Sequence, residues 1–232
     1  MSSSFSAEFH RRGAALVPAS IDGNQIGALK DALRAPELSR SERGGAIYGI
    51  RNLLGLPAVR EAACAPAITA HLTLLMGAGF RPVRGIFFDK TANANWPVPW
   101  HQDLSVAVRK SHDVAGWTNW SVKRGVPHAQ PPSEILGRMV TVRLHLDDCP
   151  ADNGALRIVP GSHLAGLLSR KSIQSVDTEP QTIVARAGDA LFMRPLILHA
   201  SSPSGSPSHR RVLHLEFAPE DVLPDGLEWA DA

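Results

Sequence analysis

Cysteine is scarce in this sequence: the 232 residues include only two, Cys64 and Cys149. Two cysteines cannot build the disulfide framework of a small secreted protein, so we expect free thiols and a cytoplasmic location. The N-terminal segment Met1–Phe9 has neither the basic start nor the apolar centre of a signal peptide. The longest apolar stretch, Ala67–Phe80, is interrupted by His71 and two glycines. We therefore expect no membrane partner.

An excess of charge of one sign is also missing. The chain has 24 Lys and Arg residues against 22 Asp and Glu residues, which gives a net charge of +2. The basic residues are scattered, whereas proteins that bind nucleic acid usually gather them on one face. The sequence also has no P-loop, no dinucleotide-binding fingerprint and no Ser–His–Asp motif. We therefore expect no nucleic-acid partner.

Histidine, glycine and proline are the plentiful residues. Ten His residues are many for this length and indicate metal or acid–base chemistry. The 19 Gly and 18 Pro residues imply many turns, which favours β-structure. The length and a hydrophobic content of 44% suit a single domain over residues 1–232.

Residues 1–80 are predicted to form a helical support. Apolar residues recur there at helical spacing, with Ser20 or Asp22 available as a cap, and two further segments begin with Pro at the first helical position. The predicted helices are Ile21–Arg34, Pro57–Cys64 and Pro66–Met76, with a polar loop at Glu37–Gly45.

Residues 81–217 change to short apolar runs separated by turn signals, which is the β pattern. Asp152, Asn153 and Gly154 form a strong hairpin signal. The predicted strands are Val83–Phe88, Val98–Val108, Met139–Asp147, Leu156–Val159, Thr182–Ala185, Ala190–Met193, Ile197–His199 and Arg211–Phe217. The fold class is therefore α+β and mainly β, with a barrel or sandwich behind the helices and a C-terminal tail at residues 218–232.

One segment, at about residues 108–138, breaks this rhythm. It has little periodicity, five basic residues and two tryptophans, Trp117 and Trp120. Loops of this length without structure are uncommon and are often lids. We predict a lid in which Trp117 or Trp120 faces the substrate.

The residues that indicate chemistry begin at His101 and Asp103. If both lie on one strand, side chains two apart share a face and present an imidazole beside a carboxylate. His199, which ends an apolar run, can supply the third ligand. Two His and one carboxylate form the facial triad of non-heme Fe(II) oxygenases. A basic residue one strand further on, Arg210 or Arg211, can bind the far carboxylate of an oxo-acid.

Five motifs in this order resemble the phytanoyl-CoA dioxygenase family. They are PWHQD at Pro99–Asp103, LDD with NG at Leu146–Gly154, PGSH at Pro160–His163, GD at Gly188–Asp189, and His199-x-Ser201 followed by Arg210. The resemblance implies a double-stranded β-helix, or jelly-roll and cupin-like, core at residues 81–217 with an N-terminal helical layer. It implies the cofactor Fe(II), the co-substrate 2-oxoglutarate, and O₂. It also implies that His101, Asp103 and His199 bind the metal, and that Arg210 and Ser201 bind the co-substrate.

One residue departs from the family pattern. Many relatives carry Trp on the strand before the LDD segment, where this chain has Arg143. The same face should carry His145 and Asp147, so we expect a polar inner wall with Arg143 as a substrate contact. His145 and His214 are expected to be hydrogen-bonding groups near the site, and Lys90 a solvated charge at a strand end.

The function that these residues predict is an Fe(II)- and 2-oxoglutarate-dependent dioxygenase. It would hydroxylate, desaturate or cyclise a small polar or anionic metabolite at an unactivated C–H bond and release succinate and CO₂. Two alternatives stay open: a cupin-type metal enzyme that uses no 2-oxoglutarate, and a jelly-roll binding protein that has lost its chemistry.

Alternation along the last strand separates the two adjacent arginines. Alternate residues of this strand form two sets. The first is mixed and polar: Arg210, Val212, His214 and Glu216. The second is apolar after its first member: Arg211, Leu213, Leu215 and Phe217. We predict that the polar set faces the metal and the apolar set faces the helices.

Overall fold

Two antiparallel sheets face each other in the computed structural model, which describes residues 2–35, 38, 40–43, 46–175, 179–205 and 209–230. Within these residues the larger sheet has seven strands in the order β1-β12-β9-β14-β4-β3-β2, and the smaller has four in the order β11-β10-β13-β5. The strands of the larger sheet are β1 (Ala14–Val17), β12 (Ala190–Met193), β9 (Val140–His145), β14 (Arg210–Pro219), β4 (Phe80–Lys90), β3 (Ala46–Arg51) and β2 (Arg40–Arg43). Those of the smaller sheet are β11 (Gln181–Ile183), β10 (Leu156–Ile158), β13 (His199–Ser201) and β5 (Val98–His101).

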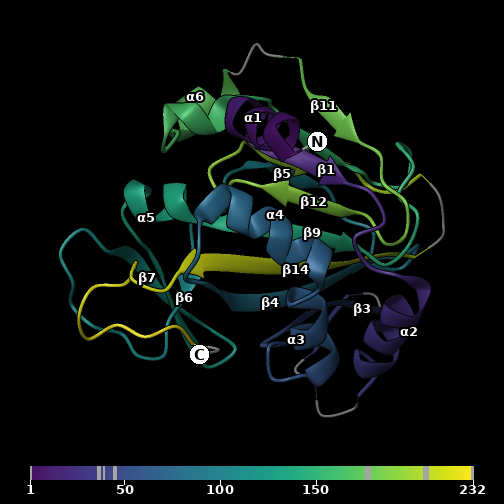
Figure 1. Ribbon diagram of the computed structural model, residues 1–232, viewed down its shortest axis with the longest axis horizontal. Helices are drawn as coiled ribbons and strands as arrows, with labels where there is room; N and C mark the ends of the chain where they lie inside the picture. Colours follow the sequence, from purple (N-terminus) through teal and green to yellow (C-terminus); the bar gives the residue numbers. More distant parts are fainter. Residues whose placement is uncertain are drawn as a thin grey trace.

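The N-terminal helices cover the outer face of the larger sheet (Figure 1). They are α1 (Ser2–Arg12), α2 (Gly23–Ala32), α3 (Pro57–Ala63) and α4 (Pro66–Met76). Asp22 caps α2 by accepting from the Gln25 backbone N–H at 2.9 Å, and the Gln25 side chain accepts from the Asp22 N–H in return. Proline opens both α3 and α4, as predicted.

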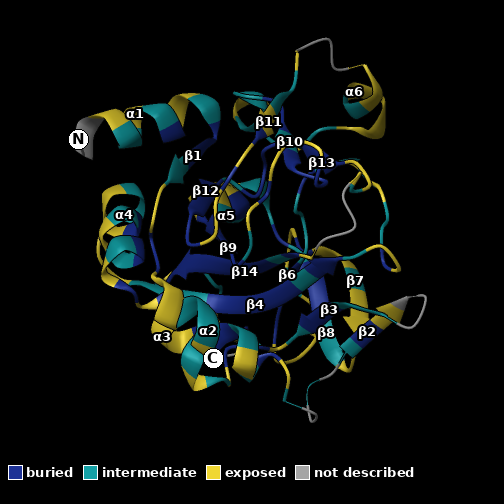
Figure 2. Ribbon diagram, turned by 90° about the vertical axis from the view of Figure 1, so that its right-hand side faces the viewer, coloured by how far each residue is buried: buried dark blue, intermediate teal, exposed yellow. Residues whose placement is uncertain are grey.

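Alternation along β14 decides which residues join this core. Leu213, Leu215 and Phe217 are at most 1% exposed and pack with the helices, while His214 and Glu216 face the other sheet. In Figure 2, β14 and β4 form a buried band between the helices and the smaller sheet. The mainly-β class, the helical layer and the predicted strand register are confirmed.

The description of residues 1–80 as a helical support is wrong in part. Three strands, β1, β2 and β3, lie in this region and form both edges of the larger sheet. β1 is short and precedes a stronger helical pattern, and β2 lies in a polar stretch that resembles a loop. Residues 37, 39, 44 and 45 of the predicted loop lie outside the described residues, but residues 40–43 form β2.

The segment at about 108–138 is also more ordered than predicted. Strand β6 (Val106–Ala107) pairs with β8 (Val126–Gln130), which pairs with β7 (Thr118–Lys123), and α5 (Ser133–Arg138) follows. Val108 bridges to Trp229, so the insertion lies against the C-terminal segment. The connection between β10 and β11 of the smaller sheet carries a 3-10 helix, η1 (Ser162–Ala165), and α6 (Arg170–Gln174). In the described part of the chain, no helix combines the length and the apolar character needed to cross a membrane.

The β14 alternation gives a stability prediction. Leu215 is fully buried among the helices, whereas Leu74 on α4 is 45% exposed. Leu215→Ala should lower the free energy of unfolding by about 2–5 kcal/mol, because the core cannot collapse fully around the lost side chain. Leu74→Ala should change it by less than about 0.5 kcal/mol. Urea denaturation of both variants measures the difference, and equal effects would contradict the assignment of the two faces.

Candidate metal centre and cavity

His101, Asp103 and His199 come together between the two sheets. His101 and His199 are directly paired residues on β5 and β13, with ring centroids 4.2 Å apart. The Nε2 atoms of His101 and His199 lie 3.7 and 3.6 Å from the two carboxylate oxygens of Asp103. One donor atom from each residue falls within 4.8 Å of the others, the only such group of three among the described residues. Three donors so placed can hold one ion.

Each histidine presents the nitrogen that a metal needs. The Nδ1–H of His101 donates to the Pro99 carbonyl at 2.8 Å, and that of His199 donates to the Ile197 carbonyl at 2.9 Å. A carbonyl only accepts, so Nδ1 carries the proton and Nε2 keeps a free lone pair. Burial lowers the pKa of His199 to about 4, which keeps its ring neutral.

Asp103 reaches this position from a loop, which corrects the prediction of a strand at Val98–Val108. Strand β5 ends at His101, and the Asp103 N–H donates to the Pro195 carbonyl at 2.9 Å. Gln102, buried between the two ligands, donates to the Leu196 and Gly166 carbonyls and accepts from the Leu168 N–H. The Oδ2 atom of Asp103 is buried without a hydrogen-bond partner. A buried, unpartnered carboxylate oxygen beside the Nε2 atoms of two imidazoles fits a bound cation.

A cavity of about 480 Å³ opens from these ligands. Its walls come from the inner faces of both sheets, with one residue from the insertion, Lys123. The cavity is lined by Arg51, Arg84, Ile86, Phe88, Trp96, Val98, His101, Gln102, Asp103, Leu104, Ser105, Lys123, Arg143, Leu156, His199, Ser201, Arg210, His214 and Glu216.

Arg210 and Ser201 lie at one end of this cavity. Arg210 is 4% exposed, its Nη1 donates to the Gly154 carbonyl, and its Nε has no partner. Arg211, in contrast, is held outside by two hydrogen bonds of 2.7 Å to the Asp147 carboxylate. Asp147 therefore pairs with Arg211 rather than lining the inner wall.

Lys90 was predicted to be a solvated charge at a strand end, and this prediction is wrong. It is 1% exposed, and its Nζ donates to the Ser201 hydroxyl at 2.9 Å and to the Ser202 carbonyl at 2.7 Å. Because Ser201 Oγ accepts a hydrogen bond from Lys90, the Ser201 O–H can donate to another acceptor. Burial, Arg210 and Arg143 lower the pKa of Lys90 to about 7. A lysine at the end of a strand is expected to reach solvent. Lys90 is instead paired with the buried Arg210 across β4 and β14, a contact that the sequence does not indicate.

Gly154 makes room for this lysine. Its φ of +61° is in the left-handed region, and a Cβ there would lie 3.0 Å from the Ser202 carbonyl oxygen and 3.4 Å from Lys90 Nζ. The Asn-Gly turn therefore does more than reverse the chain: it supplies the carbonyl that binds Arg210 and the space that Lys90 occupies.

Arg143 begins a line of polar contacts along the cavity wall. Its Nη1 donates to His214 Nδ1 at 3.1 Å, so Nδ1 is unprotonated and the neutral ring carries its proton on Nε2. His214 Nε2 lies 3.5 Å from Glu216 Oε1, which accepts from Arg84 Nη1 at 3.0 Å. His145, by contrast, is 2% exposed with no partner for either ring nitrogen, and burial, with Arg143 and Arg210 nearby, lowers its pKa to about 3. The polar inner wall is confirmed, but His145 is not a hydrogen-bonding group.

The placement predicted for Trp117 and Trp120 needs correction. Neither lines the cavity; their rings stack at 6.2 Å and pack in a second apolar cluster with the C-terminal segment. Burying two large rings against Trp229 and its neighbours removes more apolar surface from water than exposing them at a cavity mouth. The tryptophan in the cavity wall is Trp96, braced by Tyr48 at 5.0 Å. No sequence signal distinguished it.

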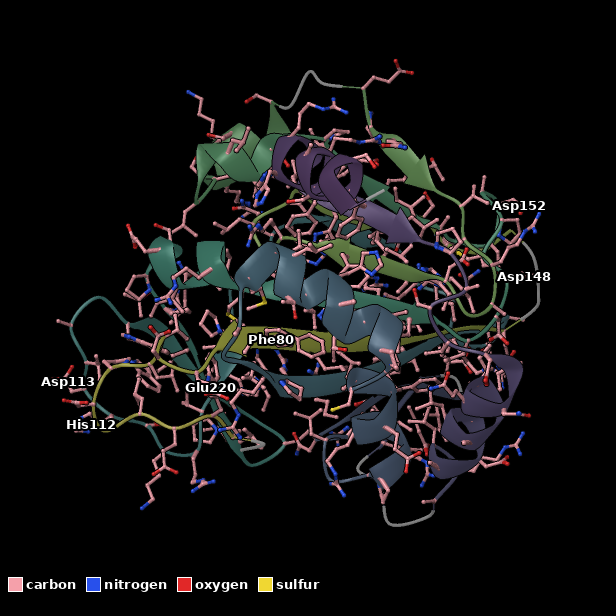
Figure 3. The ribbon with its side chains drawn as sticks, in the orientation of Figure 1. Phe80, His112, Asp113, Asp148, Asp152 and Glu220 are labelled. Atoms are coloured by element: carbon pink, nitrogen blue, oxygen red, sulfur yellow. The ribbon has the colours of Figure 1, made fainter. Side chains whose placement is uncertain are left out.

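Other acidic and histidine residues lie away from this centre. In Figure 3, His112 and Asp113 lie together at one edge of the molecule, and Asp148 and Asp152 lie at the opposite edge. All four are exposed. None of the four lines the cavity.

The geometry predicts how metal binding depends on each ligand. Replacing His101, Asp103 or His199 by Ala should weaken Fe(II) binding by about a hundredfold or more, because two donors rarely hold this metal against water. Gln102→Ala should weaken it less, since it loosens only the loop that carries Asp103. Anaerobic titration with Fe(II) measures each affinity. Wild-type affinity in His199→Ala would show that the ion binds elsewhere.

Comparison with known proteins agrees with this architecture. A methylphosphonate hydroxylase from Gimesia maris (strain ATCC 29201 / DSM 8797 / 534-30) is 30% identical over 95 residues, which span 38% of this chain and 36% of that protein. The match therefore spans about a third of the curated relative. The epimerase SnoN of nogalamycin biosynthesis superposes with a TM-score of 0.68 at 22% identity, covering 94% of this chain and 82% of its own.

The carbocyclase SnoK of nogalamycin biosynthesis superposes with a TM-score of 0.70 at 17% identity, covering 94% of this chain and 84% of its own. At these identities the superpositions establish the jelly-roll fold. The family model for phytanoyl-CoA dioxygenase (PhyH) matches residues 9–212, from α1 into β14, and so includes His101, Asp103, His199 and Arg210. The chain therefore belongs to the phytanoyl-CoA dioxygenase family.

Proposed function

We propose that this protein is an Fe(II)- and 2-oxoglutarate-dependent dioxygenase that oxidises an unactivated C–H bond of a small metabolite and releases succinate and CO₂. The observation that carries the proposal is the placement of His101, Asp103 and His199 in a cavity that also contains the buried guanidinium of Arg210. A metal site with an arginine in the same cavity is what a metal-chelating oxo-diacid requires.

The similar proteins support this activity. SnoN forms a complex with Fe3+, α-ketoglutarate and nogalamycin RO. The Gimesia relative is a hydroxylase, whereas SnoN is an epimerase and SnoK a carbocyclase. We propose hydroxylation as the principal outcome, with desaturation and ring closure as alternatives at the same site.

The side chains have distinct roles in the proposed reaction. His101, Asp103 and His199 would hold Fe(II) and leave it open to further ligands. The bound metal supplies the means to activate O₂ with electrons from 2-oxoglutarate. Arg210 binds the far carboxylate of 2-oxoglutarate, Ser201 donates its O–H to the same group, and Lys90 orients Ser201. Arg143 faces the space beside the metal and contacts the substrate.

The substrate that suits this wall is polar or anionic. Arg143, Arg210 and Lys90 are all at most 7% exposed, and among the described residues no carboxylate forms an ion pair with any of them. Arg210 and Lys90 serve the co-substrate, so a fatty acyl chain would leave the buried charge of Arg143 without a counterion, which is costly. We propose a small polar metabolite instead, and a cytoplasmic location, which the two free cysteines support.

The two alternatives fit the site less well. A cupin-type enzyme without 2-oxoglutarate would give Arg210 no ligand, although this cation is buried at the end of the cavity. A jelly-roll binding protein without chemistry predicts a broken triad, whereas His101, Asp103 and His199 are intact and adjacent.

Succinate release tests the proposed function. Purified protein with Fe(II), O₂ and 2-oxoglutarate should release succinate slowly even without its substrate, and Asp103→Ala should not. Arg210→Ala should raise the apparent constant for 2-oxoglutarate by about two to three orders of magnitude, because a desolvated charge pair contributes on the order of 3–5 kcal/mol.

Arg211→Ala is the matched control for this measurement. Arg211 is the neighbouring residue but points to Asp147, so its loss should change the constant less than about threefold. The opposite ranking of the two arginines would contradict the assignment, and absence of succinate from the wild type would reject the function.

The low pKa of Lys90 predicts a link between pH and co-substrate binding. A dianion bound at Arg210 and Ser201 raises the pKa of Lys90 from about 7, so binding takes up a proton. The contribution of Lys90 to affinity is complete below pH 7 and is lost as pH rises through the pKa of the complex.

Calorimetry of 2-oxoglutarate binding under argon, in buffers of different ionisation enthalpy, measures the protons taken up at pH 8. Lys90→Met should abolish most of this uptake. Equal uptake by the wild type and Lys90→Met would assign the titration to another group.

A further inference from the structure

A second group of cations lines the cavity, apart from Arg210. Arg51 ends β3, Arg84 lies on β4, and Lys123 ends β7 of the insertion. Three separate parts of the chain thus bring positive side chains to one region of the wall. Arg84 and Lys123 are tied together through Ser105: Arg84 Nη1 donates to its carbonyl at 3.0 Å, and Lys123 Nζ donates to its hydroxyl at 3.2 Å.

Glu216 is the carboxylate that forms an ion pair with this group, and the charge of Asp103 also attracts Lys123. Glu216 already accepts from Arg84 at 3.0 Å and lies 3.5 Å from His214, so it is engaged on two sides. In the part of the chain that the structure describes, Arg51 and Lys123 form no ion pair. Asp103 belongs to the metal group. Three cations against one carboxylate leave two positive charges at the wall.

These cations repel one another. Burial and the guanidinium of Arg84 lower the pKa of Arg51, and burial, Arg84 and Arg51 lower the pKa of Lys123. Like charges held together without a counterion cost free energy, which a bound anion would recover. Packing does not enforce this grouping, because Lys123 is exposed at the end of β7 and its hydrogen bond to Ser105 is open to solvent.

We propose that Arg51, Arg84 and Lys123 bind a phosphoryl dianion, a phosphate monoester or a phosphonate, carried by the substrate that is oxidised. This inference rests on the proposed function and names its substrate class. Two uncompensated cations match the charge of a dianion, and Arg84 adds guanidinium donors suited to phosphoryl oxygens. The anion would lie in the same cavity as the metal ligands and separate from Arg210, so the substrate and 2-oxoglutarate would not compete for one cation group.

The cavity size limits the rest of this substrate. A volume of about 480 Å³ must hold 2-oxoglutarate as well, so the carbon skeleton beside the phosphoryl group is short. Trp96 and Ile86 provide the apolar surface for it.

Binding of small probes tests this inference. The protein is loaded with Fe(II) and 2-oxoglutarate under argon at pH 8 and titrated calorimetrically with propyl phosphate, propylphosphonate, methyl propyl phosphate or butyrate. At least one of the first two, as a dianion, should bind about tenfold or more tightly than the diester and the carboxylate, which carry one charge. Tighter binding of propyl phosphate would identify the substrate as a phosphate monoester, and tighter binding of propylphosphonate would identify it as a phosphonate.

Variants then locate the site. Arg51→Gln and Lys123→Gln should each weaken binding of the preferred dianion by about tenfold. Arg51→Lys, which keeps the charge, should stay within about threefold of the wild type. Lys110→Gln in the same insertion and Arg11→Gln on α1 remove exposed charges outside the cavity and serve as controls.

The outcomes separate this inference from the proposed function. Equal binding of dianions and single anions, or wild-type affinity in both Arg51→Gln and Lys123→Gln, would overturn the phosphoryl site. If the same wild-type preparation also binds no 2-oxoglutarate and releases no succinate, the proposed function itself fails.

Discussion

The alternation of side chains along β14 is the constraint on which both the core and the site depend. Leu213, Leu215 and Phe217 pack under the helices, so the intervening residues must face the smaller sheet. Each of these then meets a defined neighbour: Arg210 is paired with Lys90, His214 with Arg143 and Ile86, and Glu216 with Arg84. A shift of one residue would bury the charged set beneath α4 and expose the apolar set in the cavity. The hydrophobic effect on one face thus positions the chemistry on the other.

Much of this could be predicted from local patterns in the sequence. Period two along residues 210–217 distinguishes the two arginines, and His101, Asp103 and His199 are recognisable by type and order. Lys90, Trp96 and Gln102 could not be assigned in the same way, because their roles depend on partners far away in the chain. Lys90 is bonded to Ser201, 111 residues later, and Gln102 to Leu196, 94 residues later. Contacts between residues so far apart produce no periodic pattern in the sequence.

The error at Trp117 and Trp120 has a related cause. A pair of tryptophans in a long insertion indicates packing, but it does not say which surface is covered. The C-terminal segment, which brings Trp229 and Leu227 beside them, provides that surface. The insertion is therefore anchored by its tryptophans and reaches the cavity through Lys123. Within the insertion, Trp117 and Trp120 fix the segment to the C-terminal segment, and Lys123 is the residue that lines the cavity.

The balance of charge inside the cavity connects these features. Arg210 and Arg143 line one region, where Lys90 is bonded to Ser201, and Arg51, Arg84 and Lys123 line another. Asp103 and Glu216 are the carboxylates of the wall. Arg210, Lys90 and Arg143 are buried and form no ion pair with a carboxylate of the described residues. Such cations cost more free energy than hydrophobic packing of the same volume, so the folded chain is not optimised for its own stability here. The line from Arg143 through His214 to Glu216 joins the two regions by hydrogen bond and close contact. His214 lies between the two positive groups in that line, with Nδ1 accepting from Arg143 and Nε2 beside Glu216, so the two groups remain separate places for two anions.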